Sequence, residues 1–268
     1  MTVVHQVTAD QVMTVVLDGP DSLNSLTPEA VDGLEAALDI AEADPTLRAM
    51  VITGAGDRAF CVGMDIDFLG PCFADPLGTF LPFLRRLDAA LERLENLGFP
   101  VIAKVNGLAR AGGLELILAC DFVIAADEAK VGDIHLEFGM PPGAGGSQRA
   151  PRKLGEQRAK LLLMTPTWLD GPTMVAWGLA LSSVPRTQLD DQVASLVAML
   201  RGRSRPAMAV VKRLIGAPRS MTFEEGMRYE RELFSRLHEQ YDEVAEGYQA
   251  FVDKRTPSWR DVDNRAFR

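Results

Sequence analysis

Apolar residues in the first part of the chain recur with two different periods. The β-branched runs VVHQV (3–7) and VMTVVL (12–17) flank Thr-Ala-Asp and predict a β-hairpin. After a turn-rich loop, Thr27 is suited to cap a helix that begins at Pro28, because apolar residues then recur at helical spacing as far as Ala43.

Short apolar runs and helical patterns then alternate along the chain. The pattern predicts strands over 48–54, 101–107, 122–126 and 130–133, helices over 80–97 and 112–120, and glycine-rich loops over 55–68 and 138–149. Strands such as MVITG and FVIAA are apolar throughout, which suits burial on both faces of a sheet. The predicted class is therefore α/β, with a mainly parallel sheet wrapped by helices.

The pattern becomes mainly helical beyond Arg149. Helical spacing covers 156–164, 170–178, 190–201, 206–215 and 223–254, with one strand-like run at 179–184. The last segment sets aromatic and aliphatic residues among many charges. It fits a solvated helix with one core face, or a helix pair that also docks on another subunit.

Composition narrows the class of protein further. A chain of 268 residues with 47% hydrophobic content can bury a large core, in one large domain or two small ones. A net charge of −9 without any long basic run argues against nucleic-acid binding. The N-terminus has no secretory pattern and no stretch is long enough to span a bilayer, so we expect a cytoplasmic protein without membrane association.

The cysteines and histidines indicate neither disulfides nor a metal. Cys61, Cys72 and Cys120 are an odd number without C-x-x-C spacing, and the three histidines do not cluster in the sequence. We therefore predict no disulfide framework and no metal site.

Two glycine-containing turns are candidates for binding an oxyanion. Gly112 and Gly113 precede a helix, where unpaired amides carry the positive end of the helix dipole, and FCVGMD places Gly63 and Met64 after a strand. Two such amides on one carbonyl oxygen would stabilise an enolate. The alternative is that the glycines only permit tight turns. PGAGG (142–146) is either a phosphate cradle or, more in keeping with its missing Lys-Ser/Thr, a bend that caps the next helix.

Glu115 is the one carboxylate in an otherwise apolar helix. Its neighbours are Leu114, Leu116 and Ile117, among which an unpaired carboxylate is costly to bury. A chemical role explains the residue better than packing does. The structural alternative is an acidic residue that complements the N-terminal end of the helix dipole.

The order of several motifs carries a family resemblance. LDGPDSLNSL, RAFCVGMDI, VNGLARAGGLELILACDFVIAA and FGMPPGAGGSQRAPRKLG follow one another as in the crotonase (enoyl-CoA hydratase/isomerase) family, which the chain resembles from about residue 3 to 258. The resemblance implies a crotonase-like spiral of ββα units over 1–200. It also implies a helical region over 201–268 that drives trimerisation and closes the coenzyme A site.

The same resemblance implies roles for individual residues. It places the oxyanion amides on Met64 and Gly112, makes Glu115 the group that activates water, and puts His135 where family hydratases carry a second glutamate. The residues assigned to substrate binding are Leu23, Asp65, Ile66, Gly113, Phe251 and Lys254. Of these, Phe251 and Lys254 match positions that reach coenzyme A in a neighbouring subunit.

The chain departs from the family pattern at the second catalytic glutamate and at a residue expected to contact the phosphates of coenzyme A. His135 replaces the second glutamate, and its ordinary pKa of about 6.5 makes both protonation states accessible near neutral pH. If the segment is extended, Asp133, His135 and Glu137 lie on one side, and we expect Glu137 to support His135 or to be exposed. Many relatives have a lysine where this chain has Asp67, and Arg58 is a weaker phosphate candidate.

The predicted function is an enoyl-CoA hydratase-type lyase that adds water across the 2,3-double bond of an acyl-CoA thioester. The resemblance implies no cofactor, because coenzyme A is part of the substrate, and a homotrimer or a hexamer built as a dimer of trimers. The apolar segment 68–84 is expected to shape the acyl pocket. The alternatives are an isomerase or a retro-Claisen C–C hydrolase of the same family, and a non-catalytic acyl-CoA binding protein.

Overall fold

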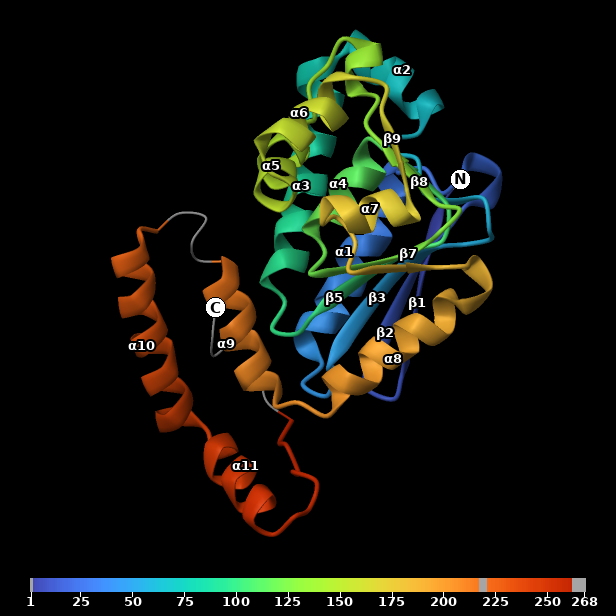
Figure 1. Ribbon diagram of the computed structural model, residues 1–268. Helices are drawn as coiled ribbons and strands as arrows, with labels where there is room; N and C mark the ends of the chain where they lie inside the picture. Colours follow the sequence, from blue (N-terminus) through green and yellow to red (C-terminus); the bar gives the residue numbers. More distant parts are fainter. Residues whose placement is uncertain (1, 217–220, 262–268) are drawn as a thin grey trace.

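Ten strands in two sheets and eleven α-helices make up the described part of this computed structural model, residues 2–216 and 221–261 (Figure 1). The strands are β1 (Val3–Ala9), β2 (Val12–Asp18), β3 (Ala49–Gly54), β4 (Ala59–Cys61), β5 (Val101–Val105), β6 (Leu108–Arg110), β7 (Phe122–Ala126), β8 (Lys130–Gly132), β9 (Trp168–Asp170) and β10 (Ser182–Val184). The α-helices are α1 (Pro28–Ala43), α2 (Ile66–Ala74), α3 (Leu81–Asn96), α4 (Gly112–Ala119), α5 (Gly146–Leu154), α6 (Glu156–Met164), α7 (Gly171–Trp177), α8 (Leu189–Arg201), α9 (Arg205–Gly216), α10 (Phe223–Gln240) and α11 (Glu243–Val252). Short 3-10 turns cover Pro20–Ser22, His135–Phe138 and Arg186–Gln188, and one π-helical turn covers Pro76–Phe80.

The two sheets are built from a repeated ββα unit. The larger sheet has the order β1-β2-β3-β5-β7-β10 and the smaller one β4-β6-β8-β9. Three times, a strand of the larger sheet is followed by a short strand of the smaller sheet and then by a helix: β3-β4-α2, β5-β6-α4 and β7-β8-α5. Neighbouring strands are parallel except β1 with β2 and β8 with β9. The predicted α/β class and the spiral of ββα units are confirmed.

Strong local signals in the sequence located the first elements correctly. β1 and β2 form the predicted hairpin, with Val3 opposite Asp18. The hydroxyl of Thr27 accepts the amide of Ala30 at 3.2 Å, and Pro28 is the first residue of α1. A capping side chain and a proline at the first position act locally, so no distant contact was needed to predict them.

Two segments predicted as loops are wrong in part, because they also contain residues of strands and helices. Residues 55–68 contain β4 and the start of α2, and 138–149 contain the last residue of a 3-10 turn and the start of α5. Gly70 and Pro71 in α2 and Pro151 in α5 weaken the helical signal, because both residue types are unfavourable inside helices. Of the two alternatives for the helical pattern over 223–254, the chain forms a helix pair, because Tyr241 between α10 and α11 is extended, with a φ of −139°. Docking of this pair on another subunit stays a prediction.

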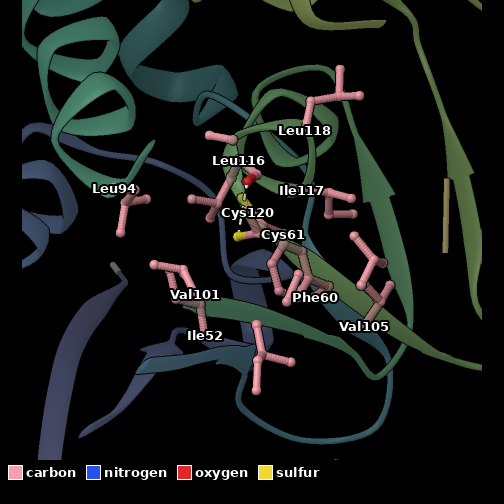
Figure 2. Packing of buried hydrophobic residues seen from close by; sticks show 14 of the residues in the cluster. Ile52, Phe60, Cys61, Leu94, Val101, Val105, Leu116, Ile117, Leu118 and Cys120 are labelled. Carbon is pink, nitrogen blue, oxygen red and sulfur yellow. Dashed lines mark hydrogen bonds between the residues drawn. The ribbon is translucent and has the colours of Figure 1, made fainter. Parts of the chain in front are cut away.

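Helix α4 is buried on every side. All eight of its residues are buried, and Leu116, Ile117 and Leu118 belong to one hydrophobic cluster with Phe60 of β4 and Val105 of β5 (Figure 2). A helix surrounded by apolar side chains in this way is held in a fixed position by close packing. Any polar group on α4 is therefore held in that fixed place as well.

Helices α9, α10 and α11 stand apart from the sheets (Figure 1). Ala209, Val210, Leu233 and Leu237 form a small hydrophobic cluster of their own. The division of the chain at residue 200 stays a prediction, and residues 217–220 and 262–268 of the predicted C-terminal region lie outside the described residues.

The described residues include no helix that combines the length and the apolar composition of a bilayer span. Cys61, Cys72 and Cys120 are free and buried. Burial raises the pKa of Cys61 and of Cys120 to about 12, so these thiols stay protonated near neutral pH.

Candidate active site

Two backbone turns meet at the wall of a cavity. Gly63, after β4, has a φ of +84°, and a Cβ placed on it would lie 2.9 Å from the amide nitrogen of Gly112. Leu26 holds the first turn, because its amide donates to Gly63 O at 2.7 Å and its carbonyl accepts the amide of Asp65 at 3.0 Å. Gly63, the residue before Met64, is therefore in direct contact with Gly112.

The amides of Met64 and Gly112 have no hydrogen-bond partner within residues 2–216 and 221–261. Both residues line the same cavity. Gly112 is the first residue of α4, so its N–H is one of the donors that a helix leaves unbonded at its positive end. Two donors of this kind beside one cavity are what an oxyanion-binding site needs, and the oxyanion role of Met64 and Gly112 stays a prediction.

Ala111 forms the turn before α4, and the glycines that follow it, Gly112 and Gly113, allow close packing. Ala111 has a φ of +48° and a ψ of −119°, a conformation that costs a non-glycine residue about 1–3 kcal/mol. A Cβ on Gly113 would lie 1.9 Å from the carbonyl oxygen of Cys61, so only glycine fits where α4 meets β4. Close packing thus explains Gly113, whereas the interpretation that a glycine permits a tight turn fits Gly63, whose φ is +84°.

Glu115 is buried in the first turn of α4, with 2% of its surface exposed. Its Oε1 accepts the amide of Ala144 at 2.8 Å and the amide of Gly146 at 2.9 Å. Burial raises the pKa of Glu115, and the charge of His135 and the two amide hydrogen bonds oppose this rise. The carboxylate is held at Oε1 and keeps Oε2 available.

The PGAGG loop supports Glu115. Gly145 has a φ of +88° and occupies the N-cap of α5, as expected for the predicted bend before a helix. Two amides of this loop bind the carboxylate, a contact that the sequence analysis did not anticipate.

His135 is held by Asp133. Its Nδ1 lies 2.6 Å from Oδ1 of Asp133, whose side chain is 1% exposed. Because a carboxylate only accepts hydrogen bonds, Nδ1 carries a proton, and Nε2 is the atom that faces Glu115. His135 begins a 3-10 turn and the segment is not extended, so Glu137 is exposed and does not support it. Asp133 has the supporting position instead.

Glu115 and His135 face each other across a short gap. Oε2 of Glu115 lies 3.9 Å from Nε2 of His135, and one oxygen atom about 2.8 Å from each, an ordinary hydrogen-bond distance, fits this spacing. Burial lowers the pKa of His135, but the hydrogen bond and charge of Asp133, together with the charge of Glu115, outweigh it and raise the pKa. The pair combines a buried carboxylate with an imidazole that stays protonated to higher pH than a free one.

The cavity beside these groups has a volume of about 290 Å³ and is mostly apolar. The predicted acyl-pocket segment 68–84 contributes several lining residues, namely Leu69, Phe80, Leu81, Phe83 and Leu84. The remaining lining residues are Val62, Met64, Ile66, Leu87, Arg110, Ala111, Gly112, Glu115, Ile134, His135, Phe138, Met140, Pro141, Pro142 and Gly143. The described residues hold no cluster of three or more His, Cys, Asp or Glu side chains suited to a metal ion.

The residues assigned to substrate binding lie in different places. Ile66 lines the cavity, whereas Gly113 is buried against β4. Asp65 caps α2, and its pKa is lowered first by the hydrogen bond from Ser25 at 2.7 Å. Leu23 is partly buried, has a φ of +54° and ends the Pro20–Ser22 turn. A substrate-binding role for these residues stays a prediction.

The residues assigned to coenzyme A are exposed in this chain. Phe251 is 83% exposed, and it lies with Lys254 at the end of α11, far from α4 and β8 (Figure 1). Arg58 and Asp67 are exposed as well. Contribution of Phe251 and Lys254 to the site of a neighbouring subunit stays a prediction.

Sequence reasoning missed Asp133 as the partner of His135, the two amides that bind Glu115, and Arg110 in the cavity wall. The alternation that grouped Asp133 with His135 was the available signal for the first of these. For Arg110, the signal was a single basic residue in an otherwise apolar run, LARAGGLELILA. No local pattern pointed to the amides of Ala144 and Gly146.

Comparison with known proteins places this geometry in context. The family model described as enoyl-CoA hydratase/isomerase matches residues 8–263. The chain is 33% identical to a probable enoyl-CoA hydratase of Rhizobium meliloti, over 94% of this chain and 96% of that one. It is also 33% identical to the mitochondrial enoyl-CoA hydratase of Pongo abelii, over 92% and 83%. A crystal structure of an enoyl-CoA hydratase from Bacillus anthracis matches with a TM-score of 0.91 and 29% identity, over 97% and 99%.

Proposed function

Because the chain belongs to the enoyl-CoA hydratase/isomerase family of enzymes, we propose that it is a hydro-lyase that adds water across the 2,3-double bond of an acyl-CoA thioester. The observation that supports this proposal most directly is the 3.9 Å separation of Glu115 Oε2 and His135 Nε2. A water oxygen in this gap is hydrogen-bonded to a base on one side and to an acid on the other.

The proposed reaction uses four groups of the chain. The amides of Met64 and Gly112 bind the thioester oxygen and stabilise the enolate that forms when water attacks C3. Glu115 takes a proton from the attacking water, and His135 gives its Nε2 proton to C2. The proton on Glu115 then returns to His135 through the new hydroxyl group or solvent, which restores both groups. The net change is addition of OH at C3 and H at C2.

Hydration of unbranched trans-2-enoyl-CoA esters is the direct test of this proposal. We expect the conjugated enoyl absorbance to fall and mass spectrometry to show a product heavier by one water. Formation of that absorbance from a 3-enoyl-CoA, without hydration, would favour the isomerase. Cleavage of a β-diketone would favour the C–C hydrolase, and binding without turnover over a broad panel would favour a non-catalytic protein.

Asp133 is proposed as a positioning residue that keeps His135 protonated. In Asp133→Asn, the side-chain oxygen can still accept Nδ1–H, but the negative charge is gone. Because that charge raises the pKa of both His135 and Glu115, its removal lowers both values. The alkaline limb of kcat/KM reports loss of the His135 proton and the acid limb reports protonation of Glu115, so both limbs are expected to move to lower pH.

The matched control for this pH profile is Glu137→Gln, which removes the charge of an exposed carboxylate two residues from His135. Its profile should coincide with that of the unaltered protein. An unshifted profile for Asp133→Asn would show that Asp133 does not set the protonation of the site.

The helical C-terminal region is proposed to form the contacts of a homotrimer or a hexamer. Phe223, Phe234 and Phe251 on α10 and α11 are 86%, 60% and 83% exposed, which is unusual for large aromatic side chains. In such an assembly, Phe251 and Lys254 are available to bind coenzyme A held by a neighbouring subunit. A reaction without a separate cofactor and a cytoplasmic location also stay predictions.

A further inference from the structure

Arg110 is a charged residue in the cavity wall that the proposed hydration does not use. It is the last residue of β6, is partly buried, and lines the cavity together with Glu115 and His135. Its Nε is buried without a hydrogen-bond partner. No ion pair or hydrogen bond of its side chain is found in the described part of the chain. A buried, unpaired donor on a cation is costly and calls for an explanation.

The buried arginines of the described residues differ from Arg110 in having partners. Arg149 binds Glu95 at 2.8 Å, and Arg48 binds Asp261 at 2.8 Å. Arg205 donates to the carbonyl of Asp44 at 2.8 Å. The fold supplies acceptors for these three arginines. Among the described residues, Arg186 has a buried Nε without a partner as Arg110 does, but only Arg110 of the two lines the cavity.

We propose that Arg110 binds a carboxylate on the acyl group, so that the preferred substrates are CoA thioesters of dicarboxylic acids. This inference rests on the proposed acyl-CoA function. A guanidinium presents parallel N–H donors that match a carboxylate in a bidentate pair. Apart from His135, no other basic side chain is found among the described residues that line the cavity. Because Glu115 is anionic when it acts as a base, an acyl carboxylate needs a cation in this cavity, and Arg110 supplies it.

Arg110 is close in sequence to Gly112, which is proposed to bind the thioester oxygen. Arg110 lies two residues before Gly112, so their Cα atoms are at most about 7 Å apart. The side chain of Arg110 therefore begins within about one side-chain length of the amide of Gly112, the proposed oxyanion donor. An acyl carboxylate bound there is attached through a short carbon chain to the thioester.

Binding of saturated thioesters tests this subsite without turnover. Calorimetry with the full chain compares glutaryl-CoA with pentanoyl-CoA, which differ only in a terminal carboxylate, and succinyl-CoA and adipyl-CoA with butyryl-CoA and hexanoyl-CoA. We expect at least one dicarboxylic ester to bind about tenfold more tightly than its partner, because a charge-assisted hydrogen bond is typically worth at least this factor. Arg110→Gln should abolish the preference and leave the affinity for the uncharged ester unchanged.

The control variant is Lys130→Gln, which removes a positive charge from an exposed position of β8 in the same sheet and should keep the preference. Equal weakening of both esters by Arg110→Gln would overturn the proposal. Such equal weakening would assign Arg110 to the coenzyme A moiety, which the two esters share, because a contact with a coenzyme A phosphate cannot distinguish them.

The absence of any preference in the unaltered protein would also overturn the proposal. Failure of this subsite is distinguishable from failure of the proposed function. Turnover of crotonyl-CoA without a carboxylate preference removes only the subsite. A carboxylate preference in binding, with no enoyl thioester hydrated, supports the subsite and removes only the hydratase.

Discussion

Replacing Glu115 by glutamine is expected to lower kcat for hydration of a 2-enoyl-CoA by about 10²- to 10⁴-fold, the range for loss of a positioned general base. Glutamine has nearly the same shape, and its oxygen can accept the amides of Ala144 and Gly146 as Oε1 does now. It cannot take a proton from the water between Glu115 and His135. The measurement is the initial rate of loss of enoyl absorbance.

A thermal melt checks that Glu115→Gln still folds. A carboxyl group with a raised pKa contributes stability below its unfolded pKa and loses it as pH rises through the folded pKa. The glutamine variant has no carboxyl group to ionise. At pH values above the folded pKa of Glu115, it should therefore melt at the same temperature as the unaltered protein or higher. Retained turnover in a folded variant would remove Glu115 from the mechanism, and Glu137→Gln serves as the control of equal charge change.

Replacing Met64 by proline is expected to lower kcat by about 10²- to 10³-fold, as removal of one oxyanion donor does in other enzymes. Proline has no N–H, and the Met64 amide has no partner in the described residues, so the change breaks no hydrogen bond of the fold. The preceding Gly63, with its φ of +84°, is a residue that tolerates such a conformation. The hydrogen bonds of Leu26 to Gly63 and Asp65 remain.

Met64→Ala is the matched control, because it shortens the same side chain at the cavity wall and keeps the amide. We expect it to retain most of kcat and to change KM for the acyl chain instead. Equal rates for the proline and alanine variants, with both folded, would contradict the oxyanion role of residue 64. Steady-state kinetics with one enoyl-CoA, together with circular dichroism spectra, decide between these outcomes.

The site contains features that lower stability and that its proposed chemistry explains. Ala111 has a positive φ, unfavourable for a residue other than glycine, next to the Gly112 amide, and Glu115 is a carboxylate buried in an apolar helix. Neither feature improves packing, and both lie beside the same cavity. Local strain and buried charge of this kind concentrate where a protein positions reacting groups.

The sequence by itself determined the features that depend on near neighbours along the chain. The cap of α1 at Thr27, the β1–β2 hairpin and the buried character of α4 follow from residues a few positions apart. The order of its motifs also indicated the family, and with it Glu115 and His135 as members of one site. These signals are local or additive, so a linear reading can detect them.

Only the tertiary structure decided which groups meet in space. Asp133 supports His135 because that segment turns into a 3-10 helix, whereas an extended strand would have offered Glu137. The amides that hold Glu115 come from a loop about thirty residues later, and only the folded chain shows that the buried Nε of Arg110 has no partner among the described residues. Such contacts depend on how separate elements pack against one another. Residue spacing along the chain carries no direct signal of that packing.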